Sequence, residues 1–126
     1  MEKKERKWLE LTFTRHGQTH DNITGTLAGQ APGKLTDVGI KQAKLTGKYL
    51  RHAKFDYIYV SDLARTKDTF KAIAGETEFI KQMNPIYTAD LREKHAGVLE
   101  GQPIKCWKEH ADKEGKDIRE YKCAKG

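Results

Sequence analysis

The chain has 126 residues, of which 37% are hydrophobic and 33% are charged, and its formal net charge is +6. This length and composition fit one globular domain with a single core of ordinary size. No run approaches the roughly 18 apolar residues that a membrane-spanning helix needs. The N-terminus is charged and no apolar stretch follows it, so we expect neither a membrane protein nor a secreted one.

Cysteine content and net charge indicate the cellular compartment and the type of partner. The two cysteines, Cys106 and Cys123, lie far apart in a lysine-rich segment. Their spacing matches neither a zinc site nor a disulfide-rich scaffold, which favours reduced thiols in a cytoplasmic protein. The excess of positive charge predicts polyanionic partners, either phosphorylated metabolites or nucleic acid.

The first predicted element is a strand over residues 8–14. Hydrophobic residues alternate there with polar ones, which is the period of a strand with one buried face. Arg15, His16 and Gly17 follow directly, and the end of a strand is where open α/β sheets bind ligands. A guanidinium group suits phosphate or carboxylate, and an imidazole can act as nucleophile, base or ligand. Glycine allows the sharp turn that this placement needs.

The next elements follow from turn residues and propensity. Residues 17–35 are rich in glycine and small polar residues, which predicts a loop. A helix then begins with Thr36 as its N-cap. Aromatic and β-branched residues at 55–60 predict a second strand. Ser61 or Asp62 is expected to cap the helix after it.

The remaining elements complete one α/β domain. A short third strand is predicted at 86–88, and Pro103 is expected at the first position of a last helix. The order of strand, helix and strand predicts a right-handed βαβ unit with parallel strands. We expect a single domain over residues 1–126, with flexible ends at 1–7 and about 115–126.

Charged residues follow all three predicted strands. Arg15 and His16 follow the first strand, Arg65 comes shortly after the second, and Arg92 and Glu93 follow the third. Parallel strands end at one edge of a sheet, so we expect these groups in one pocket. Guanidinium groups and a helix N-terminus around an imidazole describe a phosphoryl site. Each residue alone is more simply a solvated side chain, and only their coincidence favours a site.

Four segments resemble the histidine phosphatase (phosphoglycerate mutase-like) superfamily in order and spacing, over about residues 11–104. They are Arg15-His16-Gly17-Gln18-Thr19 with Asn22, Leu35-Thr36-x-x-Gly39-x-x-Gln42-Ala43, Ser61-Asp62-Leu63-x-Arg65-Thr66-x-x-Thr69, and Leu91-Arg92-Glu93-x-x-x-Gly97-x-x-Glu100-Gly101. The last segment is most similar to the fructose-2,6-bisphosphatase branch. The resemblance implies a three-layer α/β/α fold with a mainly parallel sheet.

The resemblance also implies roles for individual residues. His16 would be the nucleophile and form a phosphohistidine that water hydrolyses. Arg15 and Arg65 would clamp the phosphoryl group, and Glu93 would be the acid and base. The substrate-binding positions implied are Arg15, Asn22, Gly29, Gln30 and Arg65. No metal or cofactor is implied, because the arginines take the place of a cation, and the partner is a small phosphorylated metabolite.

The chain departs from the family pattern in one respect. The family's second catalytic histidine comes from a late strand and precedes a glycine, whereas His16 is the only histidine followed by glycine here. That late strand is also a central sheet partner of the first strand. We therefore expect a fold truncated after its N-terminal half, with weakened or lost activity. A short isoform, a truncated gene model and a protein completed by self-association all fit. We interpret His95 as a solvated loop residue rather than a substitute.

Several functions are compatible with these observations. The leading hypothesis is a phosphatase acting on a phosphomonoester such as fructose-2,6-bisphosphate. A phosphoglycerate mutase-type transferase is the alternative within the enzyme class, and a non-catalytic protein that binds phosphate esters is the alternative outside it. A nucleic-acid binder is disfavoured because no aromatic residues are interleaved with the lysines. We expect no nucleic-acid or membrane partner.

Overall fold

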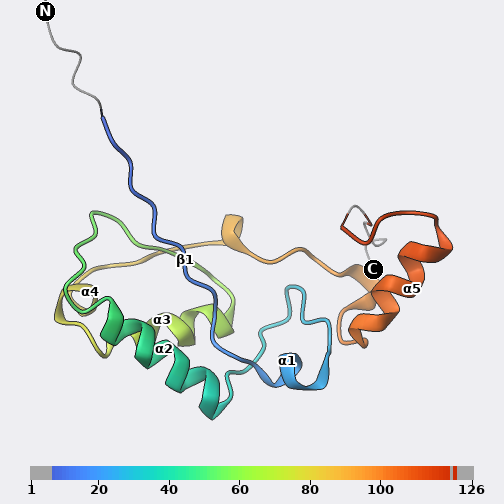
Figure 1. Ribbon diagram of the computed structural model, residues 1–126, viewed down its shortest axis with the longest axis horizontal. Helices are drawn as coiled ribbons and strands as arrows, with labels where there is room; N and C mark the ends of the chain where they lie inside the picture. The colour runs from blue at the N-terminus through green and yellow to red at the C-terminus, as the bar shows by residue number, and fades with distance from the viewer. Residues whose placement is uncertain (1–6, 120, 122–126) are drawn as a thin grey trace, which may run out of the picture.

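The computed structural model describes residues 7–119 and residue 121. The elements follow in this order: α1 (His20–Thr24), α2 (Asp37–Tyr49), β1 (Tyr59–Ser61), α3 (Ala64–Ala74), α4 (Glu78–Lys81), β2 (Ile86–Thr88), the 3-10 helices η1 (Ala89–Leu91) and η2 (Gly97–Leu99), and α5 (Ile104–Lys113). Figure 1 shows α2, α3 and α4 with the strands in one lobe and α5 in another. Of the expected flexible ends, 1–7 and about 115–126, residues 1–6, 120 and 122–126 lie outside the described residues.

The second and third predicted strands form a parallel pair, β1 and β2, whereas the first strand of the predicted βαβ unit does not form. Their register sets Tyr59 opposite Ile86, and the third strand lies where it was predicted. The second strand is shorter than the predicted 55–60. Pro85 comes just before Ile86 and has no N–H with which to extend the ladder. The mixed α/β class with a parallel sheet is confirmed.

The predicted strand over 8–14 is wrong for the structure described. These residues belong to no strand, and Figure 1 shows them as a trace that leaves the body of the molecule. Their hydrophobic side chains are exposed, and Phe13 is 85% accessible. A strand needs a neighbouring backbone for its ladder, and none of the described residues provides one. The alternation therefore predicted neither the burial nor the pairing of these residues.

The core of the larger lobe lies between α2, α3 and α4. Ala43, Ile73 and Ile80 are buried there, one from each helix. Helices α2 and α3 approach closely at Gly47, where an added Cβ would collide with the backbone of Ile73. This tight packing fixes the position of α3, whose first turn carries Arg65. None of the helices in the described part is long and apolar enough to cross a membrane.

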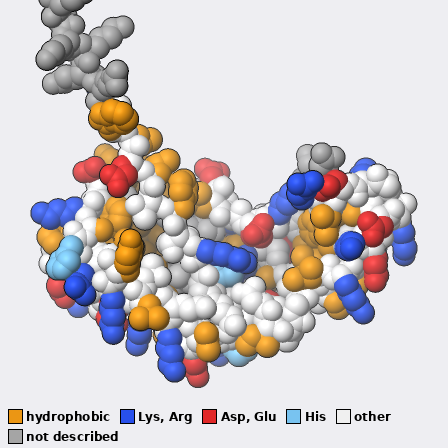
Figure 2. Space-filling model, in the orientation of Figure 1, with side chains coloured by type: hydrophobic (Ala, Val, Ile, Leu, Met, Phe, Trp, Pro, Cys, Tyr) orange, Lys and Arg blue, Asp and Glu red, His pale blue; other side chains and the backbone are white. Residues whose placement is uncertain are grey.

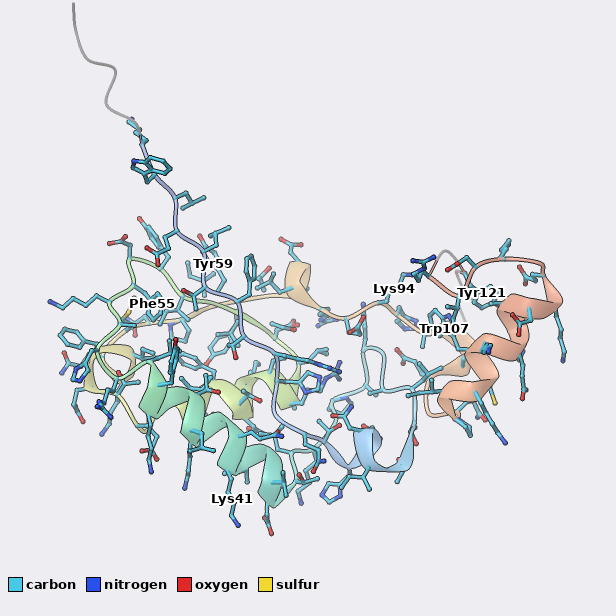
Figure 3. All side chains as sticks on the ribbon, viewed as in Figure 1. Lys41, Phe55, Tyr59, Lys94, Trp107 and Tyr121 are labelled. Atoms are coloured by element: carbon cyan, nitrogen blue, oxygen red, sulfur yellow. The ribbon has the colours of Figure 1, made fainter. Side chains whose placement is uncertain are left out.

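A second core lies under α5. Its buried residues are Ala96, Leu99, Trp107, Ala111 and Tyr121. Trp107 meets Tyr121 edge-on with ring centroids 5.9 Å apart, and its ring N–H donates to the carbonyl of Ile118 at 3.1 Å. Figure 3 shows Trp107 and Tyr121 together, with Lys94 nearby. Beyond α5, Ile118 and Tyr121 contact Trp107, and the flexibility expected from about residue 115 stays a prediction.

The helix starts test the capping predictions. The side chain of Thr36 accepts a backbone N–H bond and caps α2, as predicted. Helix α3 instead has Leu63 at its N-cap, with no side-chain cap. The carboxylate of Asp62 is bound to Arg92, and the hydroxyl of Ser61 only accepts from the Leu63 N–H at 3.5 Å. The predicted cap of α3 is therefore wrong, because a longer-range partner takes the carboxylate.

The predicted loop over 17–35 contains the short helix α1. A capping box between Thr19 and Asn22 starts this helix. The helix was not predicted because the glycine content of the segment favoured a loop. Farther along, Thr26 forms an isolated bridge with Pro103 and ties the loop to the start of α5. Pro103 is the N-cap of α5, one position before the predicted one.

Candidate active site

His16 is half-buried at the point where the exposed N-terminal segment meets the helices. Its Nδ1 lies 2.8 Å from the carbonyl oxygen of Gly17. A carbonyl oxygen only accepts hydrogen bonds, so in the neutral ring Nδ1 carries the proton. The lone pair is then on Nε2, which is the nitrogen presented for nucleophilic attack.

One hydrogen bond holds the backbone next to His16 against α3, and a second fixes its acceptor within that helix. The N–H of Gly17 donates to the hydroxyl of Thr69 at 3.0 Å, and this hydroxyl donates to the carbonyl of Arg65 at 2.8 Å. His16 is thereby tied to the helix that carries Arg65. The role of Thr69 was missed from the sequence, although its place at the end of the Ser61–Thr69 motif was a signal.

The side chains of Arg15 and Asn22 differ in their hydrogen-bond partners. Arg15 is exposed, and its guanidinium has no hydrogen-bond partner in the part of the chain that is described. Asn22 closes the capping box of α1. Its side-chain Oδ1 accepts from the backbone N–H of Thr19 at 2.9 Å, and its backbone N–H donates to the Thr19 hydroxyl at 3.2 Å. The side-chain amide nitrogen of Asn22 is therefore the group left to meet a ligand.

Arg65 is only 3% exposed and lies in the first turn of α3, as predicted. Its two terminal nitrogens donate to the carbonyls of Ala31 at 2.6 Å and Gly29 at 2.8 Å. Its Nε is buried and has no partner. The backbone N–H of Arg65 donates to Pro32 at 3.1 Å. Arg65 therefore organises the 29–32 loop, and its buried charge meets neutral carbonyls rather than an anion.

The side chain of Gln30 joins this loop to the segment that follows β2. Its Nε2 donates to the carbonyl of Glu93 at 3.3 Å, and its Oε1 accepts from Arg92 at 3.5 Å. Its backbone N–H donates to the carboxylate of Glu100 at 2.7 Å. Gln30 is thus held by three partners from beyond residue 90, and Glu100 is a second residue whose role the sequence analysis missed.

Arg92 and Asp62 form a two-point ion pair at the ends of the two strands. Nε binds Oδ1 at 2.6 Å and Nη2 binds Oδ2 at 2.7 Å. Hydrogen bonding to Arg92 lowers the pKa of Asp62, and the carboxylate raises the pKa of Arg92. The side chain of Glu93 is exposed and accepts the N–H of Lys94 at 2.9 Å. It carries no ion pair in the part of the chain that is described.

The structure brings some predicted site residues together and leaves others apart. Arg65, Gly29, Gln30 and the backbone of Glu93 meet around the 29–32 loop, and Gly17, the residue after His16, binds the same helix through the hydroxyl of Thr69. No described hydrogen bond links the side chains of Arg15 or Glu93 to this group. Figure 2 shows that the surface is hollowed between the two lobes. Of the predicted site residues, the buried guanidinium of Arg65 lies in this group, the imidazole of His16 lies on the residue before Gly17, and the exposed guanidinium of Arg15 lies outside it.

Comparison with known proteins decides the family. Residues 11–124 match the model described as histidine phosphatase superfamily (branch 1). The chain belongs to this superfamily. Over 95 residues it is 40% identical to the fructose-2,6-bisphosphatase TIGAR of Bos taurus, an alignment that covers 75% of this chain and 35% of that protein.

Solved structures of the superfamily agree with this assignment. Phosphoglycerate mutase from Bacillus anthracis str. Sterne matches with a TM-score of 0.73 and 25% identity, over 83% of this chain and 47% of that one. A mycobacterial glucosyl-3-phosphoglycerate phosphatase, solved with VO3, matches with a TM-score of 0.66 and 28% identity, over 76% of this chain and 46% of that one. The fold is therefore phosphoglycerate mutase-like, and the chain spans about a third to a half of the length of these superfamily members.

Proposed function

We propose that the chain carries the phosphoryl-accepting residues of a phosphatase that hydrolyses a phosphomonoester of a small phosphorylated metabolite, with His16 as nucleophile. The observation that carries the proposal is the hydrogen bond from His16 Nδ1 to the Gly17 carbonyl, which leaves Nε2 as the nitrogen with a lone pair. Similarity to TIGAR supports fructose-2,6-bisphosphate or a compound like it as the substrate.

Arg65 supplies the second argument. It is a buried cation, and its only partners among the described residues are uncharged carbonyls. A buried charge without a counter-charge is costly, and an anionic ligand removes that cost. Arg15, exposed and without a partner among the same residues, is the second cation available to the ligand. Asn22, Gly29 and Gln30 complete the proposed substrate-binding set.

The proposed reaction has two steps. In the first, the lone pair of His16 Nε2 attacks phosphorus, the ester P–O bond breaks, and the leaving alkoxide takes a proton from Glu93. In the second, water attacks the phosphohistidine and gives its proton to Glu93, so that inorganic phosphate leaves and His16 is restored. Arg15 and Arg65 stabilise the negative charge of the transferred group in both steps. No metal or cofactor takes part in this scheme.

The test is the release of inorganic phosphate from fructose-2,6-bisphosphate and from phosphoglycerates. The native chain is compared with His16→Ala, and His20→Ala is the control because His20 is exposed on α1. We expect the His16 variant to lose at least about a thousandfold in rate and the control to keep the native rate. Equal rates for the native chain and His16→Ala would remove the enzymatic claim.

A mutase is the second candidate, and the match to phosphoglycerate mutase from Bacillus anthracis favours it. A mutase transfers the phosphoryl group to a hydroxyl of the substrate instead of to water. Analysis of the products of 3-phosphoglycerate separates the two, because a mutase gives an isomeric phosphoester and a phosphatase gives inorganic phosphate. Binding of phosphate esters without either product would indicate a non-catalytic binding protein.

We also propose that the chain associates with itself through residues 8–14. Their hydrophobic side chains are exposed and their backbone joins no strand, and unpaired extended backbone is a template for pairing with another chain.

The free thiol of Cys106 supports a reducing, cytoplasmic setting, whereas Cys123 lies outside the described residues.

A further inference from the structure

One peptide group in the 29–32 loop is held at both ends. The oxygen of the peptide between Gly29 and Gln30 accepts from Arg65 Nη2 at 2.8 Å. The N–H of the same peptide donates to Glu100 Oε1 at 2.7 Å. A trans peptide points its oxygen and its N–H in opposite directions, so a cation and an anion hold it from opposite sides. This arrangement fixes the plane of the peptide.

The conformation of Gly29 explains why such restraint matters. Its φ is +51°, a region that glycine enters freely, and glycine adopts negative φ values equally well. Without restraint, the peptide after Gly29 rotates and the side chain of Gln30 changes direction. An added Cβ at Gly29 would collide with Glu100 Oε1, so the carboxylate lies directly against this backbone.

The carboxylate of Glu100 is itself oriented by its neighbours. Its Oε1 also accepts from the N–H of Ala96 at 3.4 Å, and His95 Nε2 lies 3.7 Å away. The N–H of Gly97 donates to His95 Nδ1 at 2.8 Å, so in the neutral ring the proton is on Nε2, which faces the carboxylate. Leu99, the residue before Glu100, is buried in the core under α5. The lobe of α5 thus fixes where Glu100 reaches the loop.

We propose that Glu100 is a positioning residue of the candidate site. It fixes the peptide between Gly29 and Gln30 against Arg65 and so holds the side chain of Gln30, which contacts Arg92 and the Glu93 carbonyl, at the candidate site. Glu100 does not contact the reacting atoms. The inference rests on the proposed function only for the part that Gln30 plays in ligand binding, since the two hydrogen bonds on the peptide do not depend on it.

The test combines two variants, Glu100→Gln and Glu100→Ala, with the control Glu109→Gln, which alters an exposed glutamate on α5. Amide hydrogen exchange, measured by NMR, reports the Gln30 N–H, and the amide of Ile73 in the core of α3 reports global stability. Calorimetry gives the Kd for inorganic phosphate. All measurements use the full chain.

We expect the Gln30 amide to exchange at least about tenfold faster in Glu100→Ala, because a hydrogen bond to a charged group is lost. The effect is smaller in Glu100→Gln, since a neutral oxygen accepts more weakly than a carboxylate. The Kd for phosphate rises by about fivefold to tenfold in Glu100→Ala. The Ile73 amide keeps its native exchange rate, and the Glu109 variant matches the native chain throughout.

Other results overturn the proposal. Unchanged exchange at Gln30 shows that Glu100 does not hold the peptide. Faster exchange with an unchanged Kd shows that the restraint does not serve the ligand site. Equal acceleration at Gln30 and Ile73 shows a loss of global stability instead of local restraint. A native chain that does not bind phosphate contradicts the proposed function and the positioning role, and the Gln30 exchange rate then decides separately whether Glu100 restrains the loop.

Discussion

The backbones of Gly17 and Gly39 lie in direct contact. A Cβ added to Gly17 would collide with the carbonyl of Gly39, and one added to Gly39 would collide with the backbone of Gln18. The N–H of Thr36 donates to the carbonyl of Gln18 at 2.9 Å across the same junction. The segment that carries His16 is therefore packed against the first turn of α2.

Substitution of Gly39 by alanine is expected to lower the free energy of unfolding by about 2 kcal/mol, because the backbone has to move to admit the methyl group. Gly75→Ala is the matched control. Gly75 has a φ of −60°, and an added Cβ there would meet nothing closer than 3.5 Å. We expect the control to change the free energy by less than about 1 kcal/mol. Denaturant titration followed by circular dichroism measures both, and equal losses would contradict the close contact.

Substitution of Arg65 by lysine tests the two-point contact with the 29–32 loop. A single ammonium group does not reproduce the planar fork that reaches the carbonyls of Gly29 and Ala31. We expect the free energy of unfolding to fall by about 2 kcal/mol. Arg51→Lys alters an exposed arginine and is expected to leave the melting midpoint unchanged. A native midpoint for Arg65→Lys in thermal melts would argue that the fork does not organise the loop.

The Asp62–Arg92 pair predicts a pH dependence of stability. Arg92 lowers the pKa of Asp62 in the folded chain, so the carboxylate favours folding above its unfolded pKa of about 4. This contribution is lost as the pH falls through the lower, folded value. Melting midpoints recorded from about pH 7 to about pH 2 should fall less steeply for Asp62→Asn than for the native chain. Asp112→Asn, which alters an exposed aspartate, should follow the native curve, and parallel curves for all three chains would refute the assignment.

The exposed segment over 8–14 predicts association that depends on concentration. Trp8 is 84% exposed and Trp107 is buried, so Trp107→Phe leaves one reporter in the segment. As the concentration of this variant increases, the emission of Trp8 should shift to shorter wavelength and the sedimentation coefficient of the chain should rise. Adding Phe13→Lys should weaken both effects, whereas Phe79→Lys, on α4, should not. Emission and sedimentation that do not change with concentration would exclude this surface.

Short sequence patterns predicted those structural elements that depend on residues adjacent in the sequence. The cap at Thr36 and the strand at 86–88 follow from short patterns, and both are confirmed. The strand over 8–14 was not predictable in the same way. Its alternation describes one chain, whereas a ladder needs a second backbone that none of the described residues supplies.

The candidate site shows a similar division. The family motifs predicted His16 and Arg65 as site residues, but the sequence around Arg65 gives no sign that its side chain is buried against loop carbonyls. The hydrogen bond from the Gln30 backbone N–H to the Glu100 carboxylate joins residues 70 positions apart, and the sequence near one residue gives no sign of the other. Such contacts depend on how α5 packs beside the loop, which local propensity does not specify.

The most direct test of the account is the isolation of the phosphorylated intermediate. The chain is incubated with fructose-2,6-bisphosphate and quenched in base, and the modified residue is located by mass spectrometry and phosphorus NMR. We expect one acid-labile phosphoryl group on Nε2 of His16, present in His20→Ala and absent from His16→Ala. Phosphate release by the native chain with no phosphoryl group on His16, or with the group on another residue, would contradict it.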